Sequence, residues 1–333
     1  MRENEIRADD LRAEGRRLYK IDQEKMLLKK DKFVEVNCPA CDKKKYNFFY
    51  RRDSFIFVKC NFCETVFVNP RPTQEMVFEH YRTSLAEKFW NENVYPQSEE
   101  ARIKHIVIPR VKEIINFCKN YNIKTEFFMD VGAGCGTFCE QVKKTGKFKQ
   151  VIAIEPDPSP AESCRKRSIE VVEDFIENIP NNFEKASVIT SVESIEHVFD
   201  PHQYVKKIYD LLADNGLFFI TAPNIKGFDL LILKDKSDNT TAPDHLNYFH
   251  PKSIKILLER CGFKVLNIQT PGKLDAELIR NKVKQGIISL DEQPFLKRIL
   301  IDEWENYSDS FQKWLADNEL SSHMQVVARK IKN

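Results

Sequence analysis

The sequence predicts an α/β fold: a doubly wound parallel sheet preceded by a small cysteine-rich module. Three observations lead to this fold class. Short apolar runs alternate with helical patterns from residue 126 onward, a glycine-rich turn follows the first of these runs, and two Cys-x-x-Cys pairs stand ahead of it. The chain has 333 residues, of which 42% are hydrophobic, which is enough for one large domain and one small one.

Composition excludes several classes of protein. The net charge of +2 is too balanced for a general nucleic-acid binder, so we consider nucleic acid an unlikely partner. No apolar run approaches the roughly 20 residues needed to cross a bilayer. The N-terminus is charged from Arg2 onward and lacks a signal-peptide core, so we expect a cytoplasmic protein with reduced thiols. The nine cysteines then require an explanation other than disulfides.

Residues 1–35 form a charged segment for which we predict a helical arm. Both signs of charge mix with sparse apolar positions at helical spacing. Those positions are Ile6, Leu11, Leu18, Ile21, Met26 and Leu27. We assign this segment no chemistry.

Two Cys-x-x-Cys pairs predict a four-thiolate zinc site. The four thiols are those of Cys38, Cys41, Cys60 and Cys63. Between the pairs, residues 46–50 and 55–59 have the pattern of two strands, so we expect a zinc ribbon over residues 36–75. Four soft ligands leave no open coordination position, which indicates a structural zinc ion. Four unmetallated thiols or a redox dithiol are the alternatives.

The glycine-rich turn has an acid on each side. The predicted strand 126–131 contains Asp130, and glycines follow at every second position: Gly132, Gly134 and Gly136. Alternate glycines let a ligand approach main-chain N–H groups without obstruction by Cβ atoms. A second predicted strand, 150–155, ends in Glu155, which is placed to accept hydrogen bonds from the two hydroxyls of a ribose.

Two cofactors fit this layout. A nicotinamide dinucleotide site needs Gly-x-Gly-x-x-Gly, and the third glycine position holds Thr137. The sequence Asp-x-Gly-x-Gly-x-Gly instead resembles motif I of the class I S-adenosylmethionine (SAM) methyltransferases. This resemblance implies a Rossmann-like sheet of seven strands with the last one antiparallel. It also implies cofactor contacts by Asp174, Phe175 and Ser191, with the Asp174 carboxylate accepting from the adenine amino group.

The remaining elements follow in order along the chain. Residues 76–125 read as lid or linker helices, including a helix from about residue 98 that Pro109 should kink. The methyltransferase domain would occupy residues 126–333, with a helical insert at 273–319 that caps the site or forms a homodimer surface. Its further strands are predicted at 170–172, 186–191, 217–222, 263–268 and 322–330.

Catalytic candidates come from the same resemblance. The pair Glu196-His197 follows the fourth strand, and the equivalent pair takes part in catalysis in sugar C-methyltransferases. His245, after the fifth strand, and Tyr81, on a lid, are further candidates. A methyl group on a sulfonium is already electrophilic, so the enzyme mainly aligns the reactants and removes a proton, for which a histidine base is suited. We expect no metal at the reacting centre.

The resemblance extends to the acceptor. Cys-x-x-Cys, a short strand and Asn69-Pro70-Arg71-Pro72 are similar to the zinc-ribbon leader of bacterial methyltransferases that act on nucleotide sugars or surface glycans. This implies a small, sugar-linked acceptor. Two alternatives remain: an RNA-modifying methyltransferase that uses the basic residues 43–45 and 51–52, and a non-catalytic SAM-binding protein.

Overall fold

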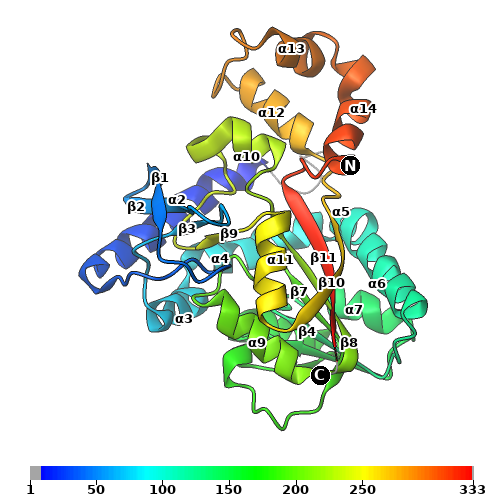
Figure 1. Ribbon diagram of the computed structural model, residues 1–333. Helices are drawn as coiled ribbons and strands as arrows, with labels where there is room; N and C mark the ends of the chain where they lie inside the picture. The colour runs from blue at the N-terminus through cyan, green and yellow to red at the C-terminus, as the bar shows by residue number, and fades with distance from the viewer. Residues whose placement is uncertain (1–8, 332–333) are drawn as a thin grey trace.

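The computed structural model describes residues 9–331, and within them the predicted α/β class is confirmed (Figure 1). A seven-stranded sheet has the order β10-β11-β8-β7-β4-β5-β6. Its strands are β4 (Phe127–Val131), β5 (Gln150–Ile154), β6 (Glu170–Val172), β7 (Ala186–Val192), β8 (Leu212–Pro223), β10 (Phe263–Gln269) and β11 (His323–Lys330).

The last strand is antiparallel, as expected from the resemblance. β11 pairs antiparallel with both β8 and β10, whereas β4 pairs parallel with β5 and β7. β11 therefore lies between the fifth and sixth strands of the sheet in chain order. The β1–β3 and β9 strands belong to a separate sheet.

Helices cover both faces of the large sheet, because successive side chains of each buried strand point to opposite faces. In β4, Phe127 and Met129 join one apolar core, and Phe128 joins the other. The first core is closed by α9 (Pro201–Leu211) and α11 (Pro251–Arg260). The second is closed by α6 (Ile108–Asn120), α7 (Thr137–Lys144) and α8 (Pro158–Lys166).

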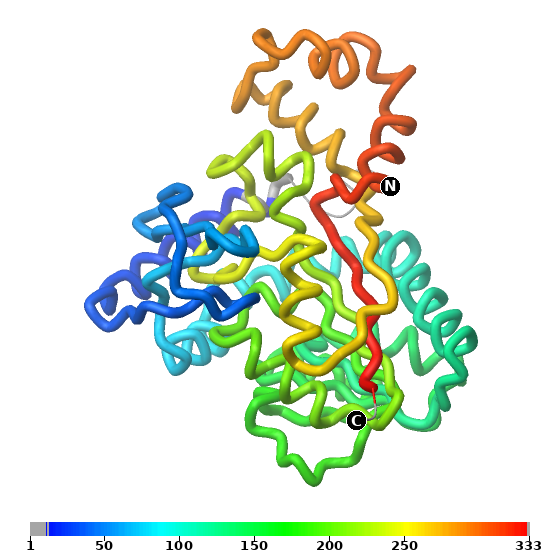
Figure 2. The backbone as a smooth tube through the Cα atoms, viewed as in Figure 1, coloured from blue at the N-terminus to red at the C-terminus, as the bar shows by residue number. Residues whose placement is uncertain are grey.

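The cysteine-rich segment forms a small antiparallel sheet that includes a strand from the far end of the chain. Its strands, in order, are β1 (Tyr46–Arg52), β2 (Phe55–Cys60), β3 (Val66–Val68) and β9 (Asn247–Tyr248). Val66 pairs with Tyr248, and Phe67 with Asn247. Cys38, Cys60 and Cys63 belong to the same apolar core as the α9–α11 face of the large sheet. The ribbon is thus built into the rest of the molecule, as Figure 2 shows.

The N-terminal helices wrap beside the ribbon and above the sheet. The elements are α2 (Asp9–Leu27), η1 (Lys30–Lys32), α3 (Gln74–Thr83), α4 (Leu85–Phe89), the π-helical turn η2 (Trp90–Val94), α5 (Tyr95–Arg102) and the π-helical turn η3 (Ile103–Val107). The expected helix start near Ser98 is wrong, because helical backbone already runs through from residue 85. Pro109 lies in the first turn of α6, which follows the π-helical turn η3.

Helix α2 is docked, although its sequence is highly charged. The buried Asp22 carboxylate accepts hydrogen bonds from the Ser84 hydroxyl and the Ala86 N–H, both at 2.9 Å. Gln23 donates to the Ala242 carbonyl at 2.6 Å. The predicted apolar position Ile6 lies outside the described residues.

The insert stands as a small helical lobe at the top of Figure 1. It comprises α12 (Asp275–Lys284), α13 (Pro294–Lys297), the π-helical turn η6 (Arg298–Asp302) and α14 (Trp304–Asp317). With α10 (Phe228–Leu233) it encloses its own apolar core. The remaining short elements are η4 (Ile176–Asn178) and η5 (Lys234–Lys236). No helix within residues 9–331 combines the length and apolar character that a bilayer crossing requires.

Candidate active site

One large cavity of about 890 Å³ opens above the carboxyl ends of the parallel strands. This size and position are usual for ligand sites in open α/β sheets. We call the part lined by Gly132, Gly134 and Phe175 the cofactor end. The part lined by Glu196, His197 and His245 is called the acceptor end.

The glycine turn has a different role at each glycine. All three have φ values in the left-handed region: +72° at Gly132, +53° at Gly134 and +77° at Gly136. A Cβ atom on Gly132 would meet the Ser194 hydroxyl, whereas a Cβ on Gly134 would meet nothing within 4 Å. Because Gly134 lines the cavity, its missing side chain keeps space open for a ligand against the main chain.

Gly136 and Ser191 lie away from the cavity, contrary to the expectation that they contact the cofactor. Gly136 is the N-cap of α7, and a Cβ there would come within 2.7 Å of the Cys164 sulfur, so this glycine permits close packing. The Ser191 side chain is fully buried, and its hydroxyl bonds to the Tyr204 hydroxyl at 2.9 Å. Neither residue is among those that line the cavity.

Two buried carboxyls lie beneath the turn. Glu155 accepts from the Gly134 N–H at 2.8 Å and from the Asp157 N–H at 2.9 Å, which fixes the turn against the end of β5. It is fully buried and does not line the cavity, in contrast to the expectation that it meets a ribose. Asp130 accepts from the Thr190 hydroxyl at 2.5 Å. Burial raises the pKa of each carboxyl to about 7, and the bound hydrogen-bond donors only partly oppose this. A cationic ligand nearby would favour their charged forms.

Asp174 and Phe175, the candidates for contact with adenine, lie next to aromatic side chains of helix α3. Asp174 accepts from the Phe175 N–H at 2.8 Å and from the Asn178 amide at 2.7 Å. The Phe175 ring stacks on Phe78 with centroids 3.7 Å apart, and Tyr81 approaches it edge-on at 6.3 Å. Tyr81 therefore lies over the cofactor end, as part of an aromatic lid.

The acceptor end brings together two histidines and a glutamate from separate loops. The His197 and His245 rings pack edge to face with centroids 4.7 Å apart. His197 Nε2 lies 4.0 Å from a carboxylate oxygen of Glu196. Burial, followed by the neighbouring His245, lowers the pKa of His197 to about 4, and burial also lowers the pKa of His245. Both imidazoles are therefore neutral at physiological pH.

Long-range hydrogen bonds hold this loop in place. The backbone carbonyl of Glu196 accepts from the Leu246 N–H at 2.8 Å and the Asn247 N–H at 3.1 Å. The Asn247 amide donates to the Val198 carbonyl at 2.8 Å. Its oxygen accepts from Arg71 at 3.0 Å. The Arg71 guanidinium, only 1% exposed, thereby connects the end of the ribbon to the loops of the acceptor end.

Sequence reasoning missed several polar residues that line the cavity. Glu99 accepts from the Thr137 hydroxyl at 2.6 Å and from Arg167 at 2.5 Å, which closes the cofactor end with a helix that precedes the sheet. Glu193 pairs with His323 at 2.9 Å on another wall. No local motif marks Glu99 or Glu193, because their partners lie 38 to 130 positions away in the chain.

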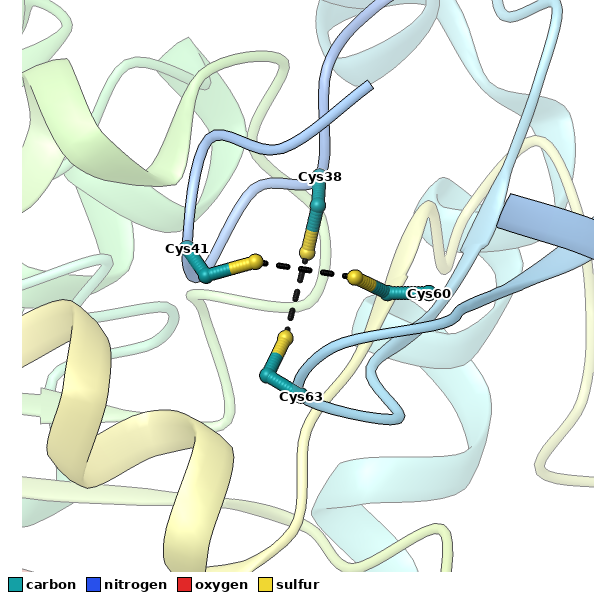
Figure 3. A group of neighbouring side chains, drawn as sticks. All are labelled: Cys38, Cys41, Cys60 and Cys63. Carbon is teal, nitrogen blue, oxygen red and sulfur yellow. Dashed lines mark hydrogen bonds between the residues drawn. The ribbon is translucent and has the colours of Figure 1, made fainter. Parts of the chain in front are cut away.

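The four ribbon cysteines converge on one point, as Figure 3 shows. The sulfur of Cys38 lies 3.4 Å from that of Cys63, and the sulfur of Cys41 lies 3.5 Å from that of Cys60. These spacings are close to the roughly 3.7 Å expected between sulfurs bound to one tetrahedral zinc ion. The donor set and geometry therefore fit a zinc ion.

The two cysteine pairs adopt the same turn. In the first, the Asp42 N–H donates to the Cys38 carbonyl, and in the second the Glu64 N–H donates to the Cys60 carbonyl. Asp42 and Glu64 have φ values of +62° and +59°. Two matching turns from separate segments present their thiols to a common centre.

Comparison with known proteins points to one family. A family described as "Methyltransferase domain" matches residues 103–268. The C-methyltransferase NovU of Streptomyces niveus is 22% identical over 220 residues, which are 64% of this chain and 47% of NovU. The ubiquinone biosynthesis O-methyltransferase of Pasteurella multocida (strain Pm70) is 31% identical over 123 residues, 32% of this chain and 50% of that protein. The chain thus spans about half the length of these curated relatives.

Among solved structures, a SAM-dependent methyltransferase from Clostridium acetobutylicum ATCC 824 aligns with 72% of this chain and 100% of its own. The TM-score is 0.47 and the identity 12%. The family match over residues 103–268 agrees with the strand order and with the one antiparallel strand found here. The chain therefore belongs to the class I SAM-dependent methyltransferases, and its sheet with the glycine turn is that of a SAM-binding domain.

Proposed function

We propose that this protein transfers the methyl group of SAM to a small-molecule acceptor, with a nucleotide sugar or a surface-glycan precursor as the substrate class. One observation carries this proposal. A single cavity joins a glycine turn with an open Gly134 to a cluster of neutral histidines. The sugar class rests on the resemblance of the zinc-ribbon leader and is the part that most needs a test.

SAM would be held by residues of the cofactor end. The Gly132–Gly134 backbone would receive the amino-acid part of the cofactor, and the buried Glu155 would hold this turn in place through the Gly134 N–H. Asp174 would accept from the adenine amino group, with Phe175, Phe78 and Tyr81 packing around the ring. Asp130 supports this turn from below through its hydrogen bond to Thr190.

Proton removal from the acceptor is assigned to the acceptor end. His197 donates its Nδ1–H to the Asp244 carbonyl at 3.0 Å, because a carbonyl only accepts. Its Nε2 therefore carries the lone pair. A neutral imidazole held in this way can take a proton as the methyl group is transferred. Glu196 and His245 lie beside it and complete the proposed catalytic group.

Zinc is proposed as a structural ion of the ribbon, bound by all four thiolates. With no ligand position left open, its contribution is to stability. We further propose the division 1–35 helical arm, 36–75 ribbon, 76–125 lid and linker, and 126–333 methyltransferase domain with its insert. An RNA acceptor is less well supported, because Arg52 is engaged within the protein by the carbonyl and hydroxyl of Thr240.

The test is incubation of the purified protein with methyl-labelled SAM and separate pools of nucleotide sugars, other small metabolites and RNA. We expect label in the sugar pool, detected by mass spectrometry, and loss of that label in Glu155→Gln. Label found only in RNA would overturn the acceptor class. SAM binding without label in any pool would overturn the catalytic proposal in favour of a non-catalytic SAM-binding protein.

A further inference from the structure

Three side chains of the acceptor end offer lone pairs to one another across a small space. One ring nitrogen of His197, one ring nitrogen of His245 and a carboxylate oxygen of Glu196 all lie within 4.8 Å of one another. They come from two loops, one after β7 and one before β9. All three residues line the cavity.

The hydrogen bonds of both imidazoles fix which nitrogen is free. His197 Nδ1 donates to the Asp244 carbonyl, and His245 Nδ1 donates to the Asn239 carbonyl, each at 3.0 Å. Each ring therefore keeps an unprotonated Nε2. Metal-binding histidines in proteins are usually oriented in this way, by donation of the other ring N–H to a carbonyl or carboxylate.

The Glu196 carboxyl lacks the partners that its burial demands. The residue is 1% exposed, and its Oε2 atom has no hydrogen-bond partner among residues 9–331. An unpaired carboxylate oxygen at this depth costs about 1–3 kcal/mol or more unless a proton or a cation compensates it. Two neutral imidazoles with unprotonated Nε2 atoms cannot act as that compensation, because they have no proton to donate from those atoms.

We propose that Glu196, His197 and His245 bind a divalent transition-metal cation, in a site separate from the four cysteines. Two imidazole nitrogens and one carboxylate oxygen suit zinc, iron(II), cobalt(II) or manganese(II) better than magnesium or calcium, which prefer oxygen ligands alone. Ligand atoms around such an ion lie roughly 3.4 Å apart. The 4.0 Å between Glu196 and His197 Nε2 needs only a small side-chain movement to reach this value.

The loops that carry the ligands are tied together, so the site has a supporting frame. The Glu196 carbonyl accepts the Leu246 and Asn247 N–H groups, and these residues directly follow His245. His245 N–H also donates to the Thr241 carbonyl at 2.7 Å. This frame limits how far the two histidines can move apart in the absence of an ion.

This inference rests on the proposed methyl transfer and changes one step of it. The single Nε2 lone pair of His197 cannot bind a cation and also take a proton, so the cation, and not His197, activates the acceptor oxygen. Three protein ligands leave coordination positions open toward the cavity. An acceptor hydroxyl bound there would lose its proton more readily, since a divalent cation lowers the pKa of a bound oxygen. The proton passes to solvent, the oxygen pair forms the bond to the methyl carbon, and the C–S pair returns to sulfur to give S-adenosylhomocysteine. The acceptor class narrows to molecules that present an oxygen to the metal, contrary to the metal-free centre expected from sequence.

The experiment is a cobalt(II) titration of the full chain after the four-cysteine site has been filled with zinc. We expect one further equivalent to bind, with weak visible bands and no thiolate-to-cobalt charge transfer. Glu196→Gln, His197→Gln and His245→Gln should each weaken this binding at least 10-fold. His323→Gln, which changes another histidine of the same cavity, should leave it unchanged.

Failure of the wild-type protein to take up the further equivalent, or equal uptake by all three variants, would overturn the metal site. S-adenosylhomocysteine binding by calorimetry verifies that each variant is folded, and Glu196→Gln preserves side-chain volume. The two proposals fail separately. Cobalt binding without methyl transfer to any acceptor pool supports the metal site and refutes the proposed activity. Methyl transfer without cobalt binding refutes the metal site alone.

Discussion

The two ends of the cavity are built in different ways. The glycine turn of the cofactor end follows β4, and its hydrogen bond to the end of the next strand, from Gly134 to Glu155, spans 21 residues. Glu99 and the aromatic side chains of α3 then close this end from outside the sheet. The acceptor end depends on segments far apart in the chain, such as Arg71 and Asn247. Local geometry is therefore enough to form the glycine turn of the first, whereas the second requires the ribbon, the loop after β7 and the β9 segment to be assembled together.

Removal of zinc should impair methyl transfer, which needs the acceptor end, and leave ligand binding at the cofactor end nearly unchanged. Cys63→Ser should abolish zinc binding and reduce methyl transfer more than 1,000-fold, because structural zinc sites contribute about 10–16 kcal/mol to folding of the residues that they hold. Affinity for S-adenosylhomocysteine should change only a few-fold. Metal analysis, turnover and calorimetry provide the measurements, with Cys118→Ser, a buried cysteine of α6, as the control. Equal loss of cofactor binding and turnover would contradict an independent cofactor end.

The reverse separation is expected from Glu155→Gln. The substitution keeps side-chain volume but replaces an acceptor of the Gly134 and Asp157 N–H groups with an amide. Affinity for S-adenosylhomocysteine should fall about 10- to 100-fold, since hydrogen bonds to charged groups are worth about 1.5–3 kcal/mol. Zinc content should remain that of the wild type. An unchanged dissociation constant in calorimetry would show that cofactor binding does not depend on Glu155.

Arg71→Met tests the connection between the ribbon and the loops of the acceptor end. It leaves the Phe199 carbonyl and the Asn247 amide oxygen without a donor. The free energy of unfolding should fall by about 1–3 kcal/mol, the cost of unsatisfied buried acceptors. Urea unfolding measures it, with the exposed Arg51→Met as the control. A loss no greater than that of the control would show that the acceptor end does not need this guanidinium.

Alanine substitutions at two glycines separate the effect of backbone strain on stability from the effect of a blocked cavity on ligand binding. Gly134 and Gly146 both have positive φ values, +53° and +62°, and a Cβ on either meets nothing within 4 Å. Alanine at each should cost about 1–2 kcal/mol of stability through strain. Of the two variants, only Gly134→Ala should also lower the affinity for S-adenosylhomocysteine, because only Gly134 lines the cavity. Equal affinity of the two variants would place the cofactor elsewhere.

The two ends should respond to pH in opposite directions. The raised pKa of Glu155, about 7, means that its contribution to stability is present at pH 4.5 and is lost as the pH rises through 7. The lowered pKa of His197, about 4, means that its contribution is present above pH 6.5 and is lost as the pH falls toward 4. As the pH rises from 4.5 to 7, the effects of Glu155 and His197 on stability oppose each other. The melting temperature of the ligand-free protein should therefore change little over this interval. Glu155→Gln should reduce the loss on the alkaline side, and His197→Gln the loss on the acid side.

From a motif of seven residues and the strands and helices around it, the sequence predicted the fold class and a seven-stranded sheet whose last strand is antiparallel. Its failures are instructive. Ser191 ends a predicted strand but points to the α9 side, because a fully buried strand presents alternate residues to opposite faces. Gly136 belongs to the motif, yet its requirement for glycine comes from packing against Cys164. The start of the helix at Ser98 was wrong because Ser98 lies inside α5, which the π-helical turn η2 joins to the preceding helix α4.

By itself, the sequence determined features that depend on neighbouring residues: the glycine turn, the acid at the end of β5 and the two matching cysteine turns. Their geometry follows from local backbone conformation and residue type. Only the tertiary structure decided which groups face Glu196, His197 and His245. The partners of Glu196 and His197 lie about fifty residues away, on loops with no periodic pattern, so hydrogen bonds and packing between distant segments select the arrangement.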